Sequence, residues 1–290
     1  WPIGQPTISS EEDAEIIRAC ISNAQSFNNK APSLGVCHQH DMAQHIGCGE
    51  RIGFPIFELN KFSDIEKHHL SSLDKIVVCS NWAKSIVEKE IPGSSVSVAP
   101  LGVDQSIFKD SKNQDSNKTI FLNIGKWEIR KGHDILAEAF NQSFKESDNV
   151  ELWMMNDNPF LTEEQQKEWN NLYLNSKLGN KIKILPRVQT HFEVAQVMRQ
   201  ADVGVFPSRA EGWNLEALKL IEIKDTEDAY DGIWFHGQGE WAHFGDKQME
   251  QLIQHMTSLL NVKNKNLPGL ETGLQFSWNN CAKQILNCVQ

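Results

Sequence analysis

The sequence predicts an α/β protein made of two Rossmann-like, doubly wound domains that face each other across a cleft. Two observations predict this architecture: short apolar segments alternate with amphipathic helical segments in both halves of the chain, and a polar stretch separates the two alternations. Such an alternation is typical of a parallel sheet covered by helices. Ligands of these sheets bind beyond the carboxyl ends of the strands, so function is expected in the loops that follow strands.

The first domain is expected over residues 1–104. An amphipathic helix is predicted over 9–27, because Ser10 and Asp13 have the spacing of a capping box and apolar residues then recur on one helical face. A second helix, NWAKSIVEKE, directly follows the third expected strand. The expected strands are SLGVCHQH, RIGFPIFEL, DKIVVCS and SVSVAP.

A polar linker is expected over 105–117, and a second domain over 118–268. The terminal segment 269–290 ends in an amphipathic helix that we expect to cross back to the first domain. The second domain is predicted to contain the strands TIFLNIG, VELWMM, KIKILP and ADVGVFPS, and the helices HDILAEAFNQSF, TEEQQKEWNNLYLNS and HFEVAQVMRQ.

Charge and composition exclude several classes of protein. The chain has 28 Lys and Arg against 38 Asp and Glu, a net charge of -10, and no long basic cluster, so a nucleic-acid partner is not expected. No apolar run reaches the roughly 18 to 20 residues of a membrane span, which argues against integral membrane contact. The 6 scattered cysteines contain no CxxC pair and favour reduced thiols in a cytoplasmic protein. The first residue is Trp1, which is not a natural start, so the sequence leaves open whether an N-terminal piece is missing.

The loop NIGKWEIRKGHD concentrates positive charge at the end of a strand. Gly125 ends the strand, and Lys126, Arg130 and Lys131 precede Gly132 and the next helix. Free N–H groups and the dipole at a helix N-terminus add to such charges, which favours phosphate binding. The alternative is a solvated basic turn. The P-loop and GxGxxG patterns are absent from the sequence, which disfavours the usual nucleoside-triphosphate and dinucleotide sites.

The loop PSRAEGWNLEAL follows the last strand of the second alternation. Pro207 ends that strand, Gly212 allows a ligand to approach the backbone, and Asn214 is a candidate N-cap for a helix that starts near Leu215. Glu211 therefore lies where its carboxylate can accept hydrogen bonds from sugar hydroxyls.

Together these loops resemble the family 4 glycosyltransferases, which have the GT-B fold. The resemblance covers NIGKWEIRKGHDILAEAF, ADVGVFPSRAEGWNLEAL, VAPLGVD and FSWNNCAKQIL, in the order and spacing of the family. It implies a retaining hexosyltransferase that moves a sugar from a nucleotide-diphosphate-sugar to a glycan, lipid or other hydroxyl acceptor. It also implies that no metal or cofactor is required, because basic side chains neutralise the leaving diphosphate.

The resemblance assigns roles to residues of both loops. Lys131, supported by Lys126 or Arg130, resembles the pair of cations that holds the donor diphosphate and stabilises its charge as it leaves. Glu211 resembles the first Glu of the family's paired-Glu motif, which contacts the donor sugar. The residues expected to cradle the sugar and phosphate are Gly212, Trp213 and Asn214, with Ser208 as a neighbour.

The loop HQHDMAQH gives two competing interpretations. His38 and His40 lie two apart at a strand end and point the same way, with Asp41 and His45 behind them. In the resemblance, His40 faces the donor sugar as a catalytic residue, with His38 as the second choice on the acceptor side. Alternatively, the four residues bind a metal ion in a hydrolase, although their spacing does not match HxHxDH. A surface or hydrogen-bonded core histidine is the third interpretation.

Two further features are assigned to the acceptor side. Glu58 is expected to end a strand there, or to be an ordinary exposed carboxylate. Trp234 and Trp241 lie in a stretch rich in Trp, Gly and His; aromatic rings stack on sugar faces, but packing is the favoured role.

One position departs from the family. Its second Glu, eight positions after the first, falls on Lys219, and the usual Gly-containing turn and buried strand do not follow. We therefore hypothesise that residues 218–220 mark a join across a missing stretch. The departure also leaves open a non-catalytic nucleotide-sugar-binding module.

Overall fold

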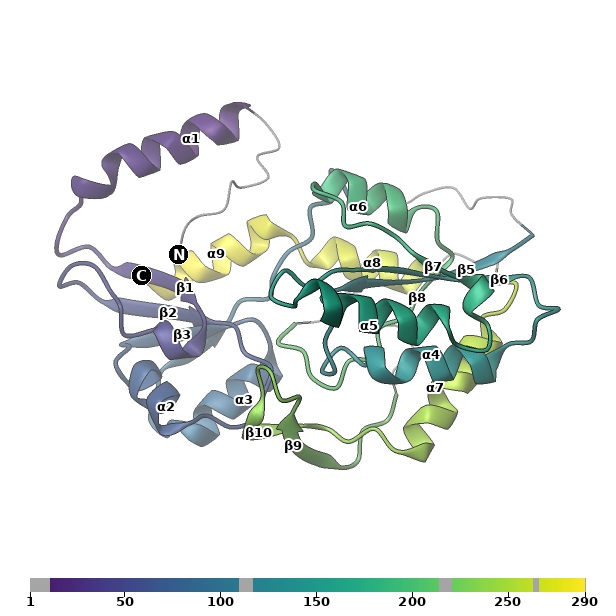
Figure 1. Cartoon of the computed structure of the whole chain (residues 1–290). Coiled ribbons are helices and arrows are strands. Elements are labelled where there is room, and N and C mark those ends of the chain that lie inside the picture. Colours follow the sequence, from purple (N-terminus) through teal and green to yellow (C-terminus); the bar gives the residue numbers. More distant parts are fainter. Residues whose placement is uncertain (1–10, 110–116, 214–220, 263–265, 290) are drawn as a thin grey trace. The chain divides into compact units, whose positions relative to one another are not determined.

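The computed structural model describes residues 11–109, 117–213, 221–262 and 266–289. Contacts divide the chain into two compact units (Figure 1). The first contains the chain up to Ile56, Asp64–Ala99, and the chain from Ala282; the second contains Phe57–Ser63 and Pro100–Cys281. This division differs from the predicted domain boundaries at Phe57–Ser63 and at residues 100–104, both of which belong to the second unit. The predicted boundaries themselves stay a prediction.

The first unit is built on a four-stranded parallel sheet of order β1-β2-β3-β4. Apolar side chains bury β2 and β3, and α2 and α3 pack through Leu70, Ala83, Ile86 and Val87. Helix α3 begins after Ser80, whose hydroxyl accepts the Ala83 N–H. The bounds are β1 (Ser33–Cys37), β2 (Arg51–Pro55), α2 (Asp64–Ser71), β3 (Lys75–Val78), α3 (Asn81–Glu90) and β4 (Val96–Val98).

Helix α1 (Glu11–Ser22) forms as its periodicity predicts. Its apolar face is not buried, however: Ala14 is its only buried residue, while Ile16 and Ile21 are exposed. The sequence pattern thus predicted the helix correctly, although Ile16 and Ile21 of its apolar face stay exposed in the described part of the chain.

The second unit has a four-stranded parallel sheet of order β7-β6-β5-β8. A core of apolar residues from β5, β6 and β7 packs against α4, α5 and α7, and α6 lies on the other side of the sheet (Figure 1). Threonine capping boxes start α5 and α6, as predicted for α6. The bounds are β5 (Thr119–Gly125), α4 (His133–Ser143), β6 (Val150–Asn156), α5 (Glu163–Leu174), β7 (Ile182–Ile184), α6 (His191–Met198), β8 (Val203–Gly204) and α7 (Asp246–Ser258).

An antiparallel hairpin of β9 (Thr226–Tyr230) and β10 (His236–Ala242) was not predicted. Its Trp241 is buried and packs with Leu59, Ala210 and Ala229. The packing role favoured for Trp241 is thereby confirmed. The remaining helices are α8 (Leu267–Gln275) and α9 (Trp278–Val289), of which the part from Ala282 belongs to the first unit.

Three expectations from the sequence concern residues outside the described ranges. The join at 218–220, the N-cap role of Asn214 and the capping box of Ser10 lie outside them. Glu58 does not end a strand, because β2 ends at Pro55 and Glu58 belongs to the second unit.

Candidate functional site

The loop between β5 and α4 contacts the loop that follows β8. Gly125 ends β5, and the Gly132 N–H donates to the Ile129 carbonyl at 2.8 Å in a tight turn. Gly132 has φ 72°, and a Cβ there would lie 2.1 Å from the carbonyl oxygen of Pro207. The chain therefore needs glycine at this point, where the loop after β5 contacts the loop after β8.

Glu211 is the centre of the site. Its Oε1 accepts hydrogen bonds from Lys131 Nζ at 2.6 Å and from Ser208 Oγ at 2.6 Å, and its Oε2 lies 3.2 Å from Arg130 NH1. Burial would raise the pKa of Glu211, but the charges of Lys131 and Arg130 outweigh this effect and lower the pKa. Glu211 is therefore ionised at neutral pH. All four residues were assigned to the donor site from the sequence, and the fold brings them into contact.

Arg130 is buried beneath Glu211. Its guanidinium donates to Glu128 Oε2 at 2.9 Å, to the Ala210 carbonyl at 2.8 Å and to Glu211. Burial would lower the pKa of Arg130, whereas the carboxylates of Glu211, Glu58 and Glu128 raise it. Arg130 is thus a structural cation that joins the two loops and positions Glu211.

Glu128 is a site residue that the sequence reasoning missed. It is buried, and its Oε1 lies 3.3 Å from Lys126 Nζ while its Oε2 accepts from Arg130. The three cations of the basic loop are therefore all paired with carboxylates. The only signal was an acidic residue inside the cluster KWEIRK.

A second ion pair fastens the same loops. Both nitrogens of the Arg209 fork donate to Asp134, each at 2.8 Å, and Arg209 NH1 also donates to the Ile129 carbonyl at 2.6 Å. Asp134 lies in the first turn of α4, where the helix dipole favours a carboxylate.

A buried polar network lies below the basic loop. His133 Nδ1 accepts the Glu128 N–H at 3.1 Å, and its Nε2 lies 3.0 Å from Asn123 Oδ1. Asn156 Nδ2 donates to the same Asn123 oxygen at 2.8 Å. Burial and the charges of Lys131 and Arg130 lower the pKa of His133 to about 3. His133 is therefore neutral at physiological pH and serves to hold the loop.

The backbone after Glu211 continues along the site. Gly212 is buried, and the Trp213 ring contacts Phe276 edge to face with centroids 5.2 Å apart. Asn214, the third residue of the expected cradle, lies outside the described residues.

The histidines of the first unit do not form a metal centre. The rings of His38 and His40 are stacked, with their centroids 5.5 Å apart, and His40 Nε2 lies 3.6 Å from Asp41 Oδ2. His45 does not join them, because its Nδ1 lies 2.9 Å from Ser33 Oγ. Across the described part of the chain, no group of three or more His, Cys, Asp or Glu side chains is arranged to hold a metal ion. The arrangement does not support the hydrolase alternative.

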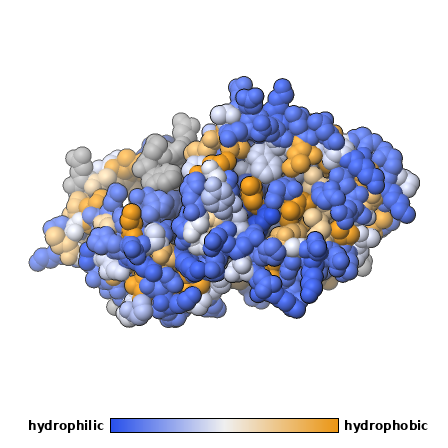
Figure 2. All heavy atoms as spheres, turned by 60° about the horizontal axis from the view of Figure 1, so that its bottom comes forward, coloured by the Kyte–Doolittle hydropathy of each residue, from blue (hydrophilic) through white to orange (hydrophobic). Residues whose placement is uncertain are grey.

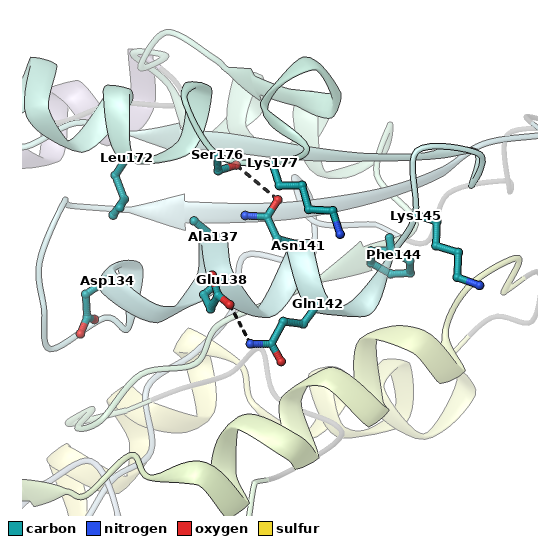
Figure 3. A pocket seen from close by; sticks show the side chains of 10 residues that line it. All are labelled: Asp134, Ala137, Glu138, Asn141, Gln142, Phe144, Lys145, Leu172, Ser176 and Lys177. Carbon is teal, nitrogen blue, oxygen red and sulfur yellow. Dashed lines mark hydrogen bonds between the residues drawn. The ribbon is translucent and has the colours of Figure 1, made fainter.

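A hollow of about 840 Å³ lies between α4 and α5 (Figure 3). It is open and its lining mixes charges of both signs. The lining residues are Asp134, Ala137, Glu138, Asn141, Gln142, Phe144, Lys145, Leu172, Ser176 and Lys177.

The fold and the paired loops define a GT-B class of protein. Residues 104–222 match the family described as "Glycosyl transferases group 1". This segment, which is less than half of the chain, contains the whole Glu211 cluster except Glu58. The match confirms the resemblance to the glycosyltransferases at this coarser level. No curated protein sequence matches the chain.

Solved structures support the fold at low sequence identity. Sucrose-phosphate synthase from Thermosynechococcus elongatus has a TM-score of 0.55 at 16% identity, covering 70% of this chain and 57% of that one. S. aureus TarM, solved with fondaparinux, alpha-GlcNAc-glycerol and UDP, has a TM-score of 0.63 at 11% identity, covering 93% and 58%. A glycosyltransferase from Rickettsia africae has a TM-score of 0.63 at 15% identity, covering 95% and 79%.

This chain thus spans less than two thirds of the length of the first two structures. The likeness confirms the predicted two-unit α/β architecture. Within the described residues no helix has both the length and the apolarity to cross a membrane.

Proposed function

We propose that the protein transfers a sugar from a nucleotide-diphosphate-sugar to a hydroxyl acceptor, with retention of anomeric configuration. The observation that supports this most directly is the cluster of Lys131, Ser208 and Glu211, which lies where β5 and β8 end, inside the segment matched by the glycosyltransferase family. Strand ends of this kind are where doubly wound sheets bind nucleotides.

The chemistry follows from the charges. Lys131 would bind the diphosphate, and the charge of the buried Arg130 behind it would help to stabilise the negative charge that develops as the diphosphate leaves. Glu211, whose carboxylate accepts a hydrogen bond from Lys131, would turn to the hydroxyls of the donor sugar. Lys126 and the amides of Gly212, Trp213 and Asn214 would complete the donor site, with no metal ion or cofactor required.

The acceptor and the remaining assignments are part of the same proposal. His40 would act on the sugar from the first unit, with His38 beside it. Glu58 is reassigned from the acceptor side to the support of Arg130, because its charge raises the pKa of that guanidinium. The cytoplasmic location expected from the sequence stays a prediction.

Calorimetric titration tests the proposal. UDP, GDP, ADP and their common sugar conjugates are titrated into the protein and into Lys131→Ala, with Lys177→Ala as a surface control. UDP comes first because the TarM structure contains it. We expect one nucleotide to bind and only Lys131→Ala to weaken it. If the folded protein binds none of these nucleotides, the transferase proposal fails.

The non-catalytic alternative rests on Lys219, which stands where the family has its second Glu. A binding module would bind the sugar nucleotide without consuming it. Chromatography of the nucleotide products after long incubation with acceptor sugars separates the two functions.

A further inference from the structure

Two exposed aromatic rings meet beside the proposed donor site. Phe160, in the loop after β6, and Trp234, at the tip of the β9–β10 hairpin, lie edge to face with centroids 5.3 Å apart. Phe160 is 64% exposed and Trp234 45% exposed. Single exposed apolar residues are common, but here two segments distant in sequence place their rings against each other in solvent.

Rigid turns hold both rings. The Asp231 carboxylate accepts three backbone N–H groups, those of Ile233, Trp234 and Phe235, at 2.8 to 2.9 Å. Phe160 N–H donates to Asn158 Oδ1 at 3.1 Å, and the buried Asn158 donates to the Trp127 carbonyl at 3.0 Å. The pair is therefore organised before any ligand binds, which lowers the entropic cost of binding.

Lys126 connects the rings to the Glu211 cluster. Its Nζ lies 5.6 Å from the centroid of the Phe160 ring and 3.3 Å from Glu128 Oε1, and Glu128 in turn holds Arg130. The ammonium is thus partly neutralised and available as a hydrogen-bond donor at the rim of the rings.

These features fit one kind of ligand. An aromatic face packs against the C–H face of a pyranose ring, and polar groups at the rim bind its hydroxyls. Hydrophobic residues form small separate patches on the face shown in Figure 2, whereas a stable protein interface buries roughly 800 Å² per partner. The two ring faces carry no formal charge, which favours a neutral ligand over an anionic one.

We propose that Phe160, Trp234 and Lys126 form a platform that binds a pyranose ring of a neutral oligosaccharide, the acceptor of the proposed transfer. That the bound sugar is the acceptor rests on the proposed function, whereas the binding of the sugar to the platform does not. Trp234 is thereby given the sugar-stacking role that the sequence analysis ranked second to packing.

The test titrates the full chain with maltoheptaose, cellohexaose and chitohexaose by calorimetry, and repeats the titrations with Trp234→Ala and Phe160→Ala. The matched control is Phe192→Ala, an exposed aromatic residue on α6. We expect at least one oligosaccharide to bind, and each platform variant to weaken its binding about tenfold while the control does not. Equal binding by the variants, or binding of none of the three sugars, overturns the proposal.

A parallel titration with UDP keeps the two proposals apart. The platform variants are expected to bind UDP as the unchanged protein does. If they lose UDP binding and not oligosaccharide binding, the rings contact the nucleotide base and the platform proposal is overturned. If no nucleotide binds but Trp234 still governs sugar binding, the transferase proposal fails and the platform stands.

Discussion

Lys131 Nζ and Glu211 Oε1 lie 2.6 Å apart, joining the loop after β5 to the loop after β8. Both residues belong to the site proposed to bind a nucleotide-diphosphate-sugar. The pair means that the cation proposed for the diphosphate is already occupied by a carboxylate. Phosphate and Glu211 would therefore compete for Lys131.

Glu211→Gln should strengthen the binding of a nucleoside diphosphate while it lowers sugar transfer. The substitution removes a negative charge beside the phosphate site, and we expect affinity to rise about threefold to tenfold. Transfer falls because the donor sugar loses a charged acceptor of its hydroxyl hydrogen bonds. Calorimetry with UDP and a turnover assay measure the two effects, with the exposed Glu222→Gln as control; weaker UDP binding by Glu211→Gln would contradict the competition.

Arg130→Met should be strongly destabilising. The side chain of Arg130 is only 7% exposed, and its loss leaves Glu128 and Glu211 with one cation fewer in a buried place. Removing one partner of a buried pair costs about 3 to 5 kcal/mol. Arg187, whose ion pair with Asp157 is exposed, provides the control: Arg187→Met should cost at most about 1 kcal/mol. Urea unfolding measures both, and equal losses would show that Arg130 does not hold the loops.

His133 should make stability depend on pH below neutrality. Its pKa is about 3 in the folded protein and about 6.5 when unfolded, so the unfolded chain binds the extra proton between these values. The free energy of unfolding should therefore be highest above about pH 6.5 and fall toward pH 3, by up to about 1.4 kcal/mol per pH unit. Urea unfolding at several pH values measures the slope.

His133→Gln is the variant that checks this origin of the pH dependence. Glutamine does not titrate, so its profile should be flatter over the same range. The lowered pKa of Glu211 acts in the same direction at lower pH, because its ion pairs are lost as pH falls through its folded pKa. An unchanged slope in His133→Gln would assign the pH dependence to carboxylates instead.

Gly132→Ala should destabilise the loop that carries Lys131. Both Gly132 and Gly237 have positive φ, at 72° and 84°, but a Cβ at Gly237 meets nothing within 4 Å. Gly237→Ala should therefore cost only the conformational strain, roughly 1 to 2 kcal/mol. Gly132→Ala adds the clash with the Pro207 carbonyl and should cost clearly more. Thermal unfolding of both variants measures the difference, and equal costs would show that the two loops can separate without penalty.

Local patterns in the sequence were sufficient for most of the elements. Apolar runs such as TIFLNIG predicted the strands of both sheets, and the capping box of Thr190 and Glu193 predicted the start of α6. These signals are local because strands and helix caps use neighbours in the chain. The β9–β10 hairpin lacks the two-residue turn that marks such elements, so it was missed.

The candidate site was only partly predictable. Ser208 and Glu211 are neighbours in sequence, and Lys131 was joined to them through the resemblance to a family. Asp134 was missed because its partner, Arg209, lies on the other loop and the two meet only in the folded chain. Glu128 is two positions from its partner Arg130, but only the fold shows that this pair is buried. Likewise, no local pattern shows that residues 57–63 pack in the second unit, so the position of Glu58 beyond the end of β2 was not predicted.

By itself, the sequence determined the alternation of strands and helices, the parallel sheets and the positions of the basic and acidic loops, because periodicity and glycine placement are properties of the chain. The tertiary structure alone decided the charge balance of the site and the meeting of Phe160 with Trp234. Pairing and burial depend on distances between segments that lie far apart in the chain, and these distances set both the pKa values and the exposed surface.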